Sequence, residues 1–445
     1  MSIRDEAFAG KETHFDLPQA IAEANRCLLC YDPPCSRACP ADTRPGEFIR
    51  KLRLKNITGA IRTIKENNIL GGACGALCPT AELCERECAA TGIGRAIAIG
   101  KIQETLVAHG QKTGFRPLEA PQNRADSKIA VLGSGPAGLA CAAELAKAGY
   151  QVSLFEERAE PGGALRYGIM PYRMDPGLLQ GEIEDLLSLG VDLQCNRRIQ
   201  GETAAEDLLN EGFAALFLAP GLWRSKQLTR RGPGLTGWYS SIAYLQAIRE
   251  GNIDELHNAF MNKRVAVIGG GDVAMECVQS ALKLGPSDVY LIYRRSYAQM
   301  PGEEKERLAA LQSGAHFLLL NQPVDFVTEQ DRITGLKCVR TELGPRDDSG
   351  RRTPQSMTGS EWVLKVDSVI EAIGNQAEPE STTWYPSVLT DQQNLIQVEE
   401  GSTRTSRPGI FAGGDIVRGP ALVVTAVEDG KKAAGEIMAY LRQRS

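Results

Sequence analysis

The pattern of hydrophobic positions changes along this chain. In residues 45–67, "PGEFIRKLRLKNITGAIRTIKEN", apolar residues recur at helical spacing, which predicts an N-terminal domain of short helices and loops over residues 1–118. The polar stretch "EAPQNRADS" (119–127) follows and predicts a linker. The pattern beyond the linker is different, so a change of architecture is expected there.

Two later segments share one order of elements. Residues 128–157, "KIAVLGSGPAGLACAAELAKAGYQVSLFEE", and residues 263–295, "KRVAVIGGGDVAMECVQSALKLGPSDVYLIYRR", each predict a strand, a glycine-rich turn, a helix and a strand. The stretch 367–379 is expected to be a strand leaving the second unit, and the C-terminus a strand, a loop and a long helix. We therefore predict an α/β fold in which an α-helical domain precedes two Rossmann-like dinucleotide-binding domains, the second inserted into the first. The predicted boundaries are 127–258 with 366–445 for the first of these domains and 259–365 for the second.

The first glycine-rich turn fits a dinucleotide site. Gly133, Gly135 and Gly138 form G-x-G-x-x-G, in which the glycines permit a tight turn, close approach to a pyrophosphate, and close packing of helix on strand. The pyrophosphate then lies at a helix N-terminus, where free N–H groups favour an anion. Glu156 ends the next strand, about 20 residues on, where a carboxylate holds ribose hydroxyls. A structural glycine turn is the plainer alternative, but it does not explain the acid.

The second turn differs in two ways. Gly269, Gly271 and Ala274 form the variant G-x-G-x-x-A, and the next strand ends in Arg294 and Arg295 instead of an acid. A guanidinium can bind a 2′-phosphate with two parallel hydrogen bonds, whereas a carboxylate would repel it. This predicts NADPH in the second domain and FAD in the first, although a solvated basic pair at a strand end is the simpler interpretation.

A late "GGD", Gly413, Gly414 and Asp415, supports the flavin assignment. A short acid there can reach a ribityl chain, and the following helix N-terminus can face the electron-rich edge of the flavin. A simple turn before a helix is the alternative. Hydride transfer between nicotinamide and flavin depends on positioning, so no catalytic residue is predicted and the four histidines are assigned no role.

Eight of the twelve cysteines lie between Cys27 and Cys88, in a first set ending in Cys-Pro and in a second, later set. Zinc sites usually show paired knuckles separated by a spacer, whereas bacterial ferredoxins end a cysteine run in Cys-Pro. A flavin reduced by two electrons also needs one-electron acceptors, which redox-inert zinc is not. We therefore predict two [4Fe-4S] clusters, for which simple counting supplies eight thiolates. The other four cysteines are expected to be small core residues: Cys141, Cys195, Cys277 and Cys338.

Bulk composition adds few constraints. The net charge of −5 gives no attraction to nucleic acid or to an anionic membrane. No apolar run approaches the length of a membrane span, and the N-terminus lacks the apolar core of a secretory signal. A cytoplasmic location is therefore expected, where thiols stay reduced and structural disulfides are rare.

Several motifs together resemble a known family: "CLLCYDPPCSRACP", "CGALCPTAELCERECA", "VLGSGPAGLACAAELAKAGY", "EPGGALRYGI", "IGGGDVAMECV", "YRRSYAQMPG" and "IFAGGDIVRG". They are similar to the small subunit of bacterial glutamate synthase and to the electron-input half of dihydropyrimidine dehydrogenase, from about residue 20 to the C-terminus. Gly163 and Asp272 lie within these motifs and are added to the predicted cofactor-binding residues. No amidotransferase or pyrimidine-reducing barrel fits in this chain, so the resemblance implies an FMN-containing partner subunit that carries the substrate chemistry.

The resemblance also implies how the clusters are held. The second cluster has a ligand that is not cysteine, which matches Gln103 in "IAIGKIQE", with Glu104 as the neighbouring possibility. Cys74 would then be a bystander, whereas simple counting makes it the eighth ligand. The implied ligands are Cys27, Cys30, Cys35 and Cys88 for one cluster, and Cys39, Cys78, Cys84 and Gln103 for the other.

The leading hypothesis is an electron-input subunit that oxidises NADPH through FAD and two clusters and reduces a partner. A pyrimidine-reducing partner is preferred because the N-terminal third looks closer to dihydropyrimidine dehydrogenase. The C-terminal half looks closer to glutamate synthase, whose large subunit is the next candidate partner. A free-standing NADPH:ferredoxin-type oxidoreductase and a redox-sensing flavoprotein remain the alternatives from other classes.

Overall fold

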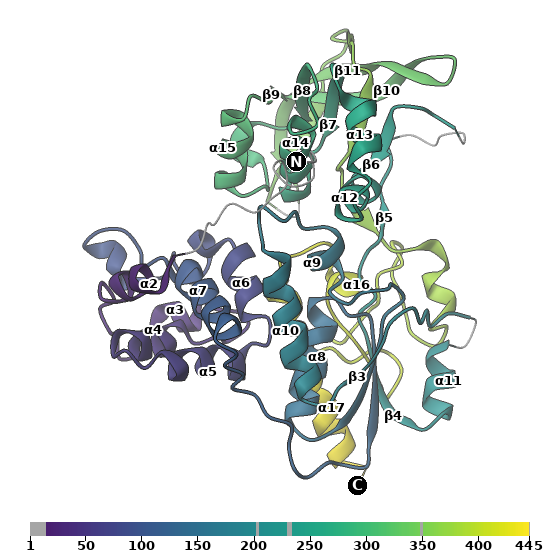
Figure 1. The fold of residues 1–445 in the computed structure, drawn as a ribbon. Helices are drawn as coiled ribbons and strands as arrows, with labels where there is room; N and C mark the ends of the chain where they lie inside the picture. The colour runs from purple at the N-terminus through teal and green to yellow at the C-terminus, as the bar shows by residue number, and fades with distance from the viewer. Residues whose placement is uncertain (1–14, 202–203, 229–233, 348–349, 445) are drawn as a thin grey trace. The chain divides into compact units, whose positions relative to one another are not determined.

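Two parallel five-stranded sheets organise the chain, and each lies in its own compact unit. The computed structural model describes residues 15–201, 204–228, 234–347 and 350–444. One unit contains the N-terminal helices and the first sheet (Figure 1). The other extends over Trp223–Gln376, with the short segment Tyr167–Met170.

The N-terminal helices are short because caps and prolines bound them. Asp16 and Gln19 form a capping box that begins the first described helix, and Pro45 occupies the first turn of another. Asn56 accepts a hydrogen bond from the backbone N–H of Gly59 and begins the next. Each of these helices except the short Pro34–Arg37 has buried residues, and in the segment 45–67 they recur at the helical spacing that the sequence predicted. The helices are α2 (Leu17–Ala24), α3 (Pro34–Arg37), α4 (Pro45–Arg53), α5 (Ile57–Asn67), α6 (Gly71–Leu77) and α7 (Ile99–Lys112).

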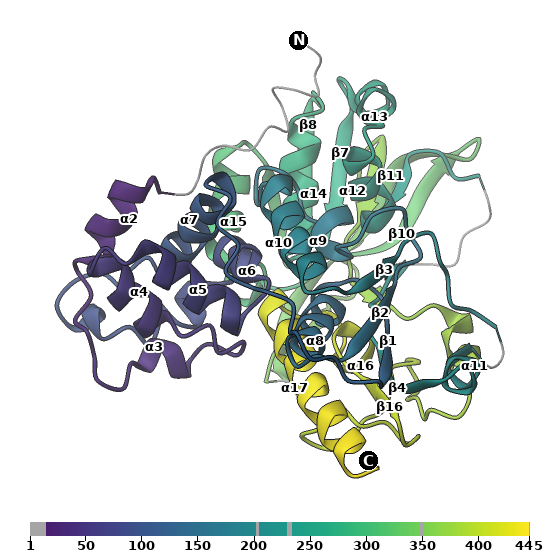
Figure 2. The same cartoon turned by 60° about the horizontal axis from the view of Figure 1, so that its bottom comes forward.

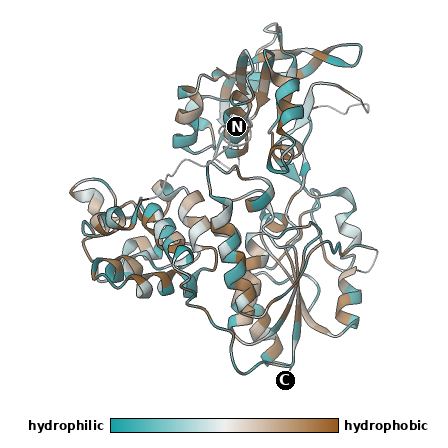
Figure 3. Ribbon diagram, viewed as in Figure 1, coloured by the Kyte–Doolittle hydropathy of each residue, from teal (hydrophilic) through white to brown (hydrophobic). Residues whose placement is uncertain are grey.

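The first sheet has the order β16-β4-β1-β2-β3, and all of its neighbouring strands are parallel. Its central strands are buried on both faces, and Figure 3 shows them coloured largely as hydrophobic. The first glycine-rich turn follows β1, at the carboxyl edge where ligands bind in open α/β sheets. The strands are β1 (Lys128–Leu132), β2 (Gln151–Phe155), β3 (Asp192–Gln194), β4 (Phe213–Leu218) and β16 (Ile410–Ala412). The main helices are α8 (Pro136–Lys147), α10 (Pro176–Ser188) and α17 (Val423–Arg442).

The N-terminal helices pack directly on the first-sheet domain, beside α10 and α17 (Figure 2). Lys65 of α5 is fully buried against Glu182 and Asp185 of α10, at 3.4 and 3.0 Å. Lys431 of α17 donates to the carbonyl oxygens of residues 41 and 67, at 2.5 and 2.7 Å. These buried contacts explain why the two predicted domains form one compact unit.

The second sheet has the order β6-β14-β7-β8-β9 and is also parallel. An antiparallel sheet, β10-β11-β12 with β13 on β11, extends the same unit. The strands of the parallel sheet are β6 (Trp238–Ser240), β7 (Arg264–Ile268), β8 (Asp288–Tyr293), β9 (His316–Leu319) and β14 (Ser368–Glu371). Those of the antiparallel sheet are β10 (Asn321–Glu329), β11 (Arg332–Arg346), β12 (Arg352–Ser356) and β13 (Trp362–Leu364).

The predicted domain boundaries at 258/259 and 365/366 differ from the observed ones. Strand β6 pairs with β14, and β14 pairs with β7, so both flanks belong to the second sheet. The chain therefore leaves the first unit near Trp223 and returns after Gln376. Parallel pairing between distant segments produces this arrangement, and the glycine motifs alone do not indicate it.

The predicted fold class is confirmed: an α-helical domain is followed by two parallel dinucleotide-binding sheets, the second inserted into the first. Within the described residues, no helix combines the length and apolarity that crossing a membrane would require.

Candidate cofactor sites

The first glycine-rich turn has the geometry that a pyrophosphate requires. Gly133 has φ +96°, and a Cβ there would lie 2.3 Å from the carbonyl oxygen of Ala219. A Cβ on Gly138 would lie 1.9 Å from the carbonyl oxygen of Gly133, so only glycine lets α8 pack this closely. At Gly135, by contrast, a Cβ would meet nothing within 4 Å. The turn is thus tight at two positions and open at the one where the phosphate approaches.

Glu156 is buried at the end of β2 and tied to this turn. Its Oε2 accepts from the backbone N–H of Ser134 at 3.1 Å and from the Ser134 hydroxyl, and its Oε1 accepts from the N–H of Arg158 at 2.9 Å. Gly163 lies on the other side, where a Cβ would be 2.7 Å from the Cα of Gly135. The structure therefore brings Glu156 and Gly163 to the turn, as expected of residues that surround one dinucleotide.

The late Gly-Gly-Asp segment is held by α17. Gly414, with φ +75°, donates its N–H to Asp429 at 2.8 Å, and the same buried carboxylate pairs with Arg418. Asp415 opens a short helix, α16 (Asp415–Arg418), and accepts from the N–H of Ala421 at 3.3 Å. Burial raises the pKa of Asp415 to about 6. A half-buried carboxylate with one backbone donor fits a partner that brings hydroxyl groups, such as a ribityl chain.

The second glycine-rich turn lies between β7 and α14 (Asp272–Leu282). A Cβ on Gly269, with φ +148°, would lie 2.3 Å from the carbonyl oxygen of Ala372, and Gly271 is open. Ala274 is fully buried. Asp272 accepts from the N–H of Glu303 at 2.8 Å, so its side chain caps a neighbouring loop.

The two arginines after β8 face different surroundings, which corrects the expectation that they act as a pair. Arg295 is buried; its Nε donates to the carbonyl oxygen of Arg352 at 2.6 Å, and its Nη2 lies 3.6 Å from Asp347. Arg294 is exposed. Partial desolvation, followed by the charges of Arg295 and Arg351, lowers the pKa of Arg294. Only Arg294 is therefore free to meet a ligand from solvent.

The thiols of the first cysteine group lie within electrostatic reach of one another. Burial raises the pKa of the Cys35 thiol to about 11, and the neighbouring thiols of Cys88, Cys27 and Cys30 raise it further. These four sulfur atoms therefore share one neighbourhood, although Cys88 is distant in sequence. Two arginines of α4 hold the loop in place: Arg53 donates to the carbonyl oxygen of Cys27 at 2.7 Å, and Arg50 to that of Cys30 at 3.3 Å.

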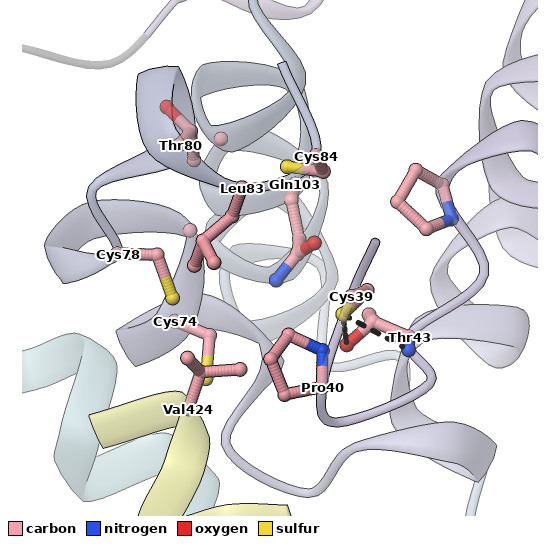
Figure 4. A pocket seen from close by; sticks show the side chains of 13 residues that line it. Cys39, Pro40, Thr43, Cys74, Cys78, Thr80, Leu83, Cys84, Gln103 and Val424 are labelled. Carbon is pink, nitrogen blue, oxygen red and sulfur yellow. Dashed lines mark hydrogen bonds between the residues drawn. The ribbon is translucent and has the colours of Figure 1, made fainter. Parts of the chain in front are cut away.

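The second cysteine group lines an enclosed cavity that is bounded by α6, α7 and the loop after α3. Figure 4 shows the side chains of Cys39, Cys78, Cys84 and Gln103 converging there, with Cys74 on the same wall. The Nε2 of Gln103 donates to the carbonyl oxygen of Gly71 at 2.5 Å, which fixes the amide and leaves its oxygen available. Glu104 does not line the cavity.

Polar neighbours of these sulfurs were not anticipated from the sequence. The N–H of Thr43 donates to the sulfur of Cys39 at 3.4 Å, and the Cys39 thiol lies 3.4 Å from the Thr43 hydroxyl. The buried side chain of Asn68 donates to Thr43 at 3.2 Å and to the sulfur of Cys74 at 3.4 Å. Ordinary Thr and Asn residues carry no sequence signal for this role, because it depends on the fold of the loops.

The donor chemistry fits iron–sulfur clusters better than single ions. Burial raises the pKa of Cys39 and of Cys84, so the thiolates need a nearby positive core. Among the residues that the structure describes, no three His, Cys, Asp or Glu side chains converge closely enough for one metal ion. Four-iron clusters, unlike redox-inert zinc, supply the one-electron acceptors that a flavin needs.

The remaining cysteines fit the core assignment in three cases out of four. Cys141, Cys277 and Cys338 are buried, whereas Cys195 is half-buried. All twelve cysteines lie in the described ranges, and every one is a free thiol.

Comparisons with known proteins agree with this organisation. A family model described as dihydropyrimidine dehydrogenase domain II, 4Fe-4S cluster, matches residues 4–114, and the pyridine nucleotide-disulphide oxidoreductase model matches residues 127–430. The glutamate synthase [NADPH] small chain of Escherichia coli is 34% identical, covering 99% of this chain and 95% of its own. The NAD-dependent dihydropyrimidine dehydrogenase subunit PreT of E. coli is 35% identical, covering 95% and 94%. A solved structure, Mycobacterium tuberculosis FprA in complex with NADPH, shares the fold with a TM-score of 0.61 at 18% identity, over 72% of this chain and 85% of that one.

Fold, sites and relatives together define an NAD(P)H-dependent FAD oxidoreductase with a 4Fe-4S domain. The chain belongs to the pyridine nucleotide-disulphide oxidoreductase family, alongside the glutamate synthase small chains and PreT-type subunits. Several of these relatives are named as a small chain or a subunit of a larger enzyme.

Proposed function

We propose that this chain is the electron-input subunit of a two-component enzyme, oxidising NADPH and delivering single electrons to a partner flavoprotein. One observation carries the proposal: α17 reaches both the flavin segment and the second cysteine cavity. Asp429 of α17 accepts from the N–H of Gly414, and Val424, near the start of the same helix, lines the cavity of the second cysteine group. One helix therefore contacts both the flavin segment and the pocket of the second cysteine group.

The proposed ligands follow from these neighbourhoods. Bound FAD accepts a hydride from the nicotinamide, and four-iron clusters carry single electrons, which supplies the change from two-electron to one-electron chemistry. The chain holds these groups in place and shields them from water. The residues proposed for FAD are Gly133, Gly135, Gly138, Glu156, Gly163, Gly414 and Asp415; those for NADPH are Gly269, Gly271, Asp272, Ala274 and Arg294. The proposed cluster ligands are Cys27, Cys30, Cys35 and Cys88, and Cys39, Cys78, Cys84 and Gln103.

An exposed apolar surface supports an exit toward a partner. Five exposed apolar residues, which we call the exit patch, are Leu28, Leu29, Tyr31, Leu54 and Ile93. The first three lie in or beside the loop of Cys27 and Cys30, and Leu54 directly follows the helix whose arginines hold that loop. Large exposed apolar side chains near a redox site favour a protein partner over a small soluble acceptor.

The preferred partner is a pyrimidine-reducing subunit that contains FMN, and the large subunit of glutamate synthase is the second candidate. The match of the N-terminal residues to a dihydropyrimidine dehydrogenase domain supports the first. The exposed Arg294 supports the second, because the glutamate synthase relative is named for NADPH and PreT for NAD.

Anaerobic titration of the purified protein tests the core of the proposal. We expect about one FAD and about eight irons per chain, and bleaching by NADPH at lower concentrations than by NADH. Absence of iron after anaerobic preparation, or a preference for NADH, would contradict it. Co-purification with the native partner, followed by assays with uracil or thymine and with glutamine plus 2-oxoglutarate, distinguishes the two partners.

The exit patch has its own test. Leu28→Ser with Tyr31→Ser should slow partner-coupled turnover while reduction of ferricyanide, a small acceptor, stays unchanged. Leu389→Ser removes another exposed leucine, 62% exposed against 47% for Leu28, and is the control. Equal loss in both assays would indicate damage to the cluster, and no loss in either would show that the partner binds elsewhere.

A further inference from the structure

Residues at the facing ends of β11 and β12 contact the end of β8, the strand that follows the second glycine-rich turn. The ring of Tyr293, the last residue of β8, lies so close to Gly270 that a Cβ there would be 2.5 Å from it. The Tyr293 hydroxyl donates to the carbonyl oxygen of Gln299 at 2.8 Å. Arg351, just before β12, donates from Nη2 to the same hydroxyl at 3.3 Å. Arg351 therefore contacts the same tyrosine whose ring lies against Gly270 of the dinucleotide turn.

The other arginines of this hairpin are engaged with its own backbone. Arg346 donates to the carbonyl oxygen of Gly350 at 2.5 Å. Arg352 donates to the carbonyl oxygens of Gly344 and Leu343, at 2.9 and 2.6 Å. Of the three arginines in this hairpin end, Arg351 alone is directed at the end of β8 among the contacts of the described residues.

Arg295 anchors this hairpin. Its buried guanidinium bonds the carbonyl oxygen of Arg352 and lies beside Asp347, and Asp347 in turn accepts from the N–H of Arg351 at 3.0 Å. Arg295 thus fixes the segment that carries Arg351. Its charge is already partnered, and its side chain is closed off from solvent.

Arg351 and Arg294 form a like-charged pair, since the charge of Arg351 contributes to the lowered pKa of Arg294. Within the part of the chain that the structure describes, no ion pair joins either guanidinium to a carboxylate. Two exposed guanidinium groups at the end of the second Rossmann strand are suited to a dianion, because each can donate two parallel hydrogen bonds to phosphate oxygens.

We propose that Arg351, together with Arg294, binds the 2′-phosphate of NADPH, and that Arg295 is a positioning residue for the hairpin. This inference rests on the proposed use of NADPH. The sequence predicted that Arg294 and Arg295 act together. In this proposal Arg351, which is distant in the chain, takes the place of Arg295.

The test compares NADPH and NADH in the full-length holoprotein, with ferricyanide as acceptor. Arg351→Gln should raise the KM for NADPH by about 10- to 100-fold, the loss expected for one charge-assisted interaction, with kcat and the KM for NADH unchanged. Inhibition by 2′,5′-ADP should weaken to the same extent, whereas inhibition by 5′-AMP should not change. Lys337→Gln, which removes one charge from an exposed position of β11, is the control and should leave all values unchanged.

The outcomes separate the two proposals. A wild-type preference for NADH would overturn the NADPH assignment itself. A wild-type preference for NADPH that Arg351→Gln leaves intact, or an equal rise of KM for both nucleotides, would overturn the role of Arg351 alone. Arg295→Lys should retain part of the discrimination, because a cation still faces Asp347; its folding is checked by FAD content.

Discussion

At the scale of single residues, the second cysteine group poses the sharpest question. Cys74 and Gln103 both line its cavity, together with the three other cysteines. The amide of Gln103 is oriented by Gly71, whereas the sulfur of Cys74 accepts a hydrogen bond from Asn68 and so has a protein partner. Because Cys39, a proposed ligand, also accepts an N–H from Thr43, the hydrogen bond to Cys74 does not separate the two residues, and Gln103 remains the ligand that the family resemblance implies.

Replacing either residue tests this assignment. Gln103→Ala should lower the iron content and alter the low-temperature EPR of the reduced protein, because an iron loses its oxygen ligand. Cys74→Ala should change neither quantity. Gln103→Glu retains an oxygen donor at the same position and should keep the iron. If iron is lost only in Cys74→Ala, the Cys74 thiol is the ligand instead of Gln103.

Asp415 predicts a pH dependence. Its pKa of about 6 in the folded protein exceeds the ordinary aspartate pKa of 3.8, so this carboxyl binds a proton more tightly in the folded than in the unfolded chain. Its contribution to stability is therefore present below about pH 4 and is lost as pH rises through 6. In the FAD-free protein at pH 7.5, Asp415→Asn should increase the free energy of unfolding by up to about 3 kcal/mol. A higher melting temperature would show this gain. The gain should shrink toward pH 5, and a gain that is independent of pH would contradict this origin.

At the scale of elements, the packing of α17 on α8 determines the shape of the flavin site. A Cβ on Gly430 of α17 would lie 2.2 Å from the carbonyl oxygen of Ala137, in the first turn of α8. Asp429, the residue before this glycine, accepts a hydrogen bond from the N–H of Gly414. A change in the spacing of the two helices would therefore also move the flavin segment. A single glycine thus couples helix packing to the flavin segment.

Two glycines on one helix make a matched pair. Gly430→Ala should destabilise the protein by about 1–3 kcal/mol or more through overpacking, and should lower the FAD content. Gly435→Ala, where a Cβ would meet nothing within 4 Å, should be neutral or stabilising by up to about 1 kcal/mol. Heat denaturation and flavin absorbance measure both effects. If the two variants behave alike, the close approach of α17 and α8 is not limiting.

At the scale of the whole chain, the union of the cysteine-bearing helices with the flavin domain depends on buried charge. Glu182 of α10 accepts from the N–H groups of Gly72 and Ala73, at 2.6 and 3.1 Å, while also facing Lys65. Burial raises the pKa of Glu182, and Lys65 opposes that effect. The pair therefore connects α10 to α6, the helix that carries Cys74 and ends at Cys78.

Replacing Lys65 should weaken the packing of the cysteine-bearing helices on the flavin domain. Lys65→Met leaves two buried carboxylates without their cation, and we expect a loss of about 3–5 kcal/mol together with a lower iron content. Glu184→Gln breaks the exposed pair with Arg116 at the same contact and should cost no more than about 1 kcal/mol. Denaturant unfolding and iron analysis distinguish them. A cost for Lys65→Met as small as that of the control would mean that the domains are held together by other contacts.

The sequence by itself determined the local chemistry: the two glycine turns, the acid after one strand and the arginines after the other, and the cysteine spacings. These features are local because a turn, a helix start or a Cys-Pro run is specified within a few residues. Family resemblance extended them to the grouping of Cys88 with the early cysteines.

Only the tertiary structure decided which distant residues meet. Parallel pairing placed β6 and β14 in the second sheet, and a hydrogen bond to Tyr293 brought Arg351 to the end of β8. Burial joined α5 to α10 through Lys65 and brought Thr43 and Asn68 to the cysteine sulfurs. Such contacts depend on how whole elements pack, and a side chain's sequence neighbours carry no information about partners that are brought to it by the fold.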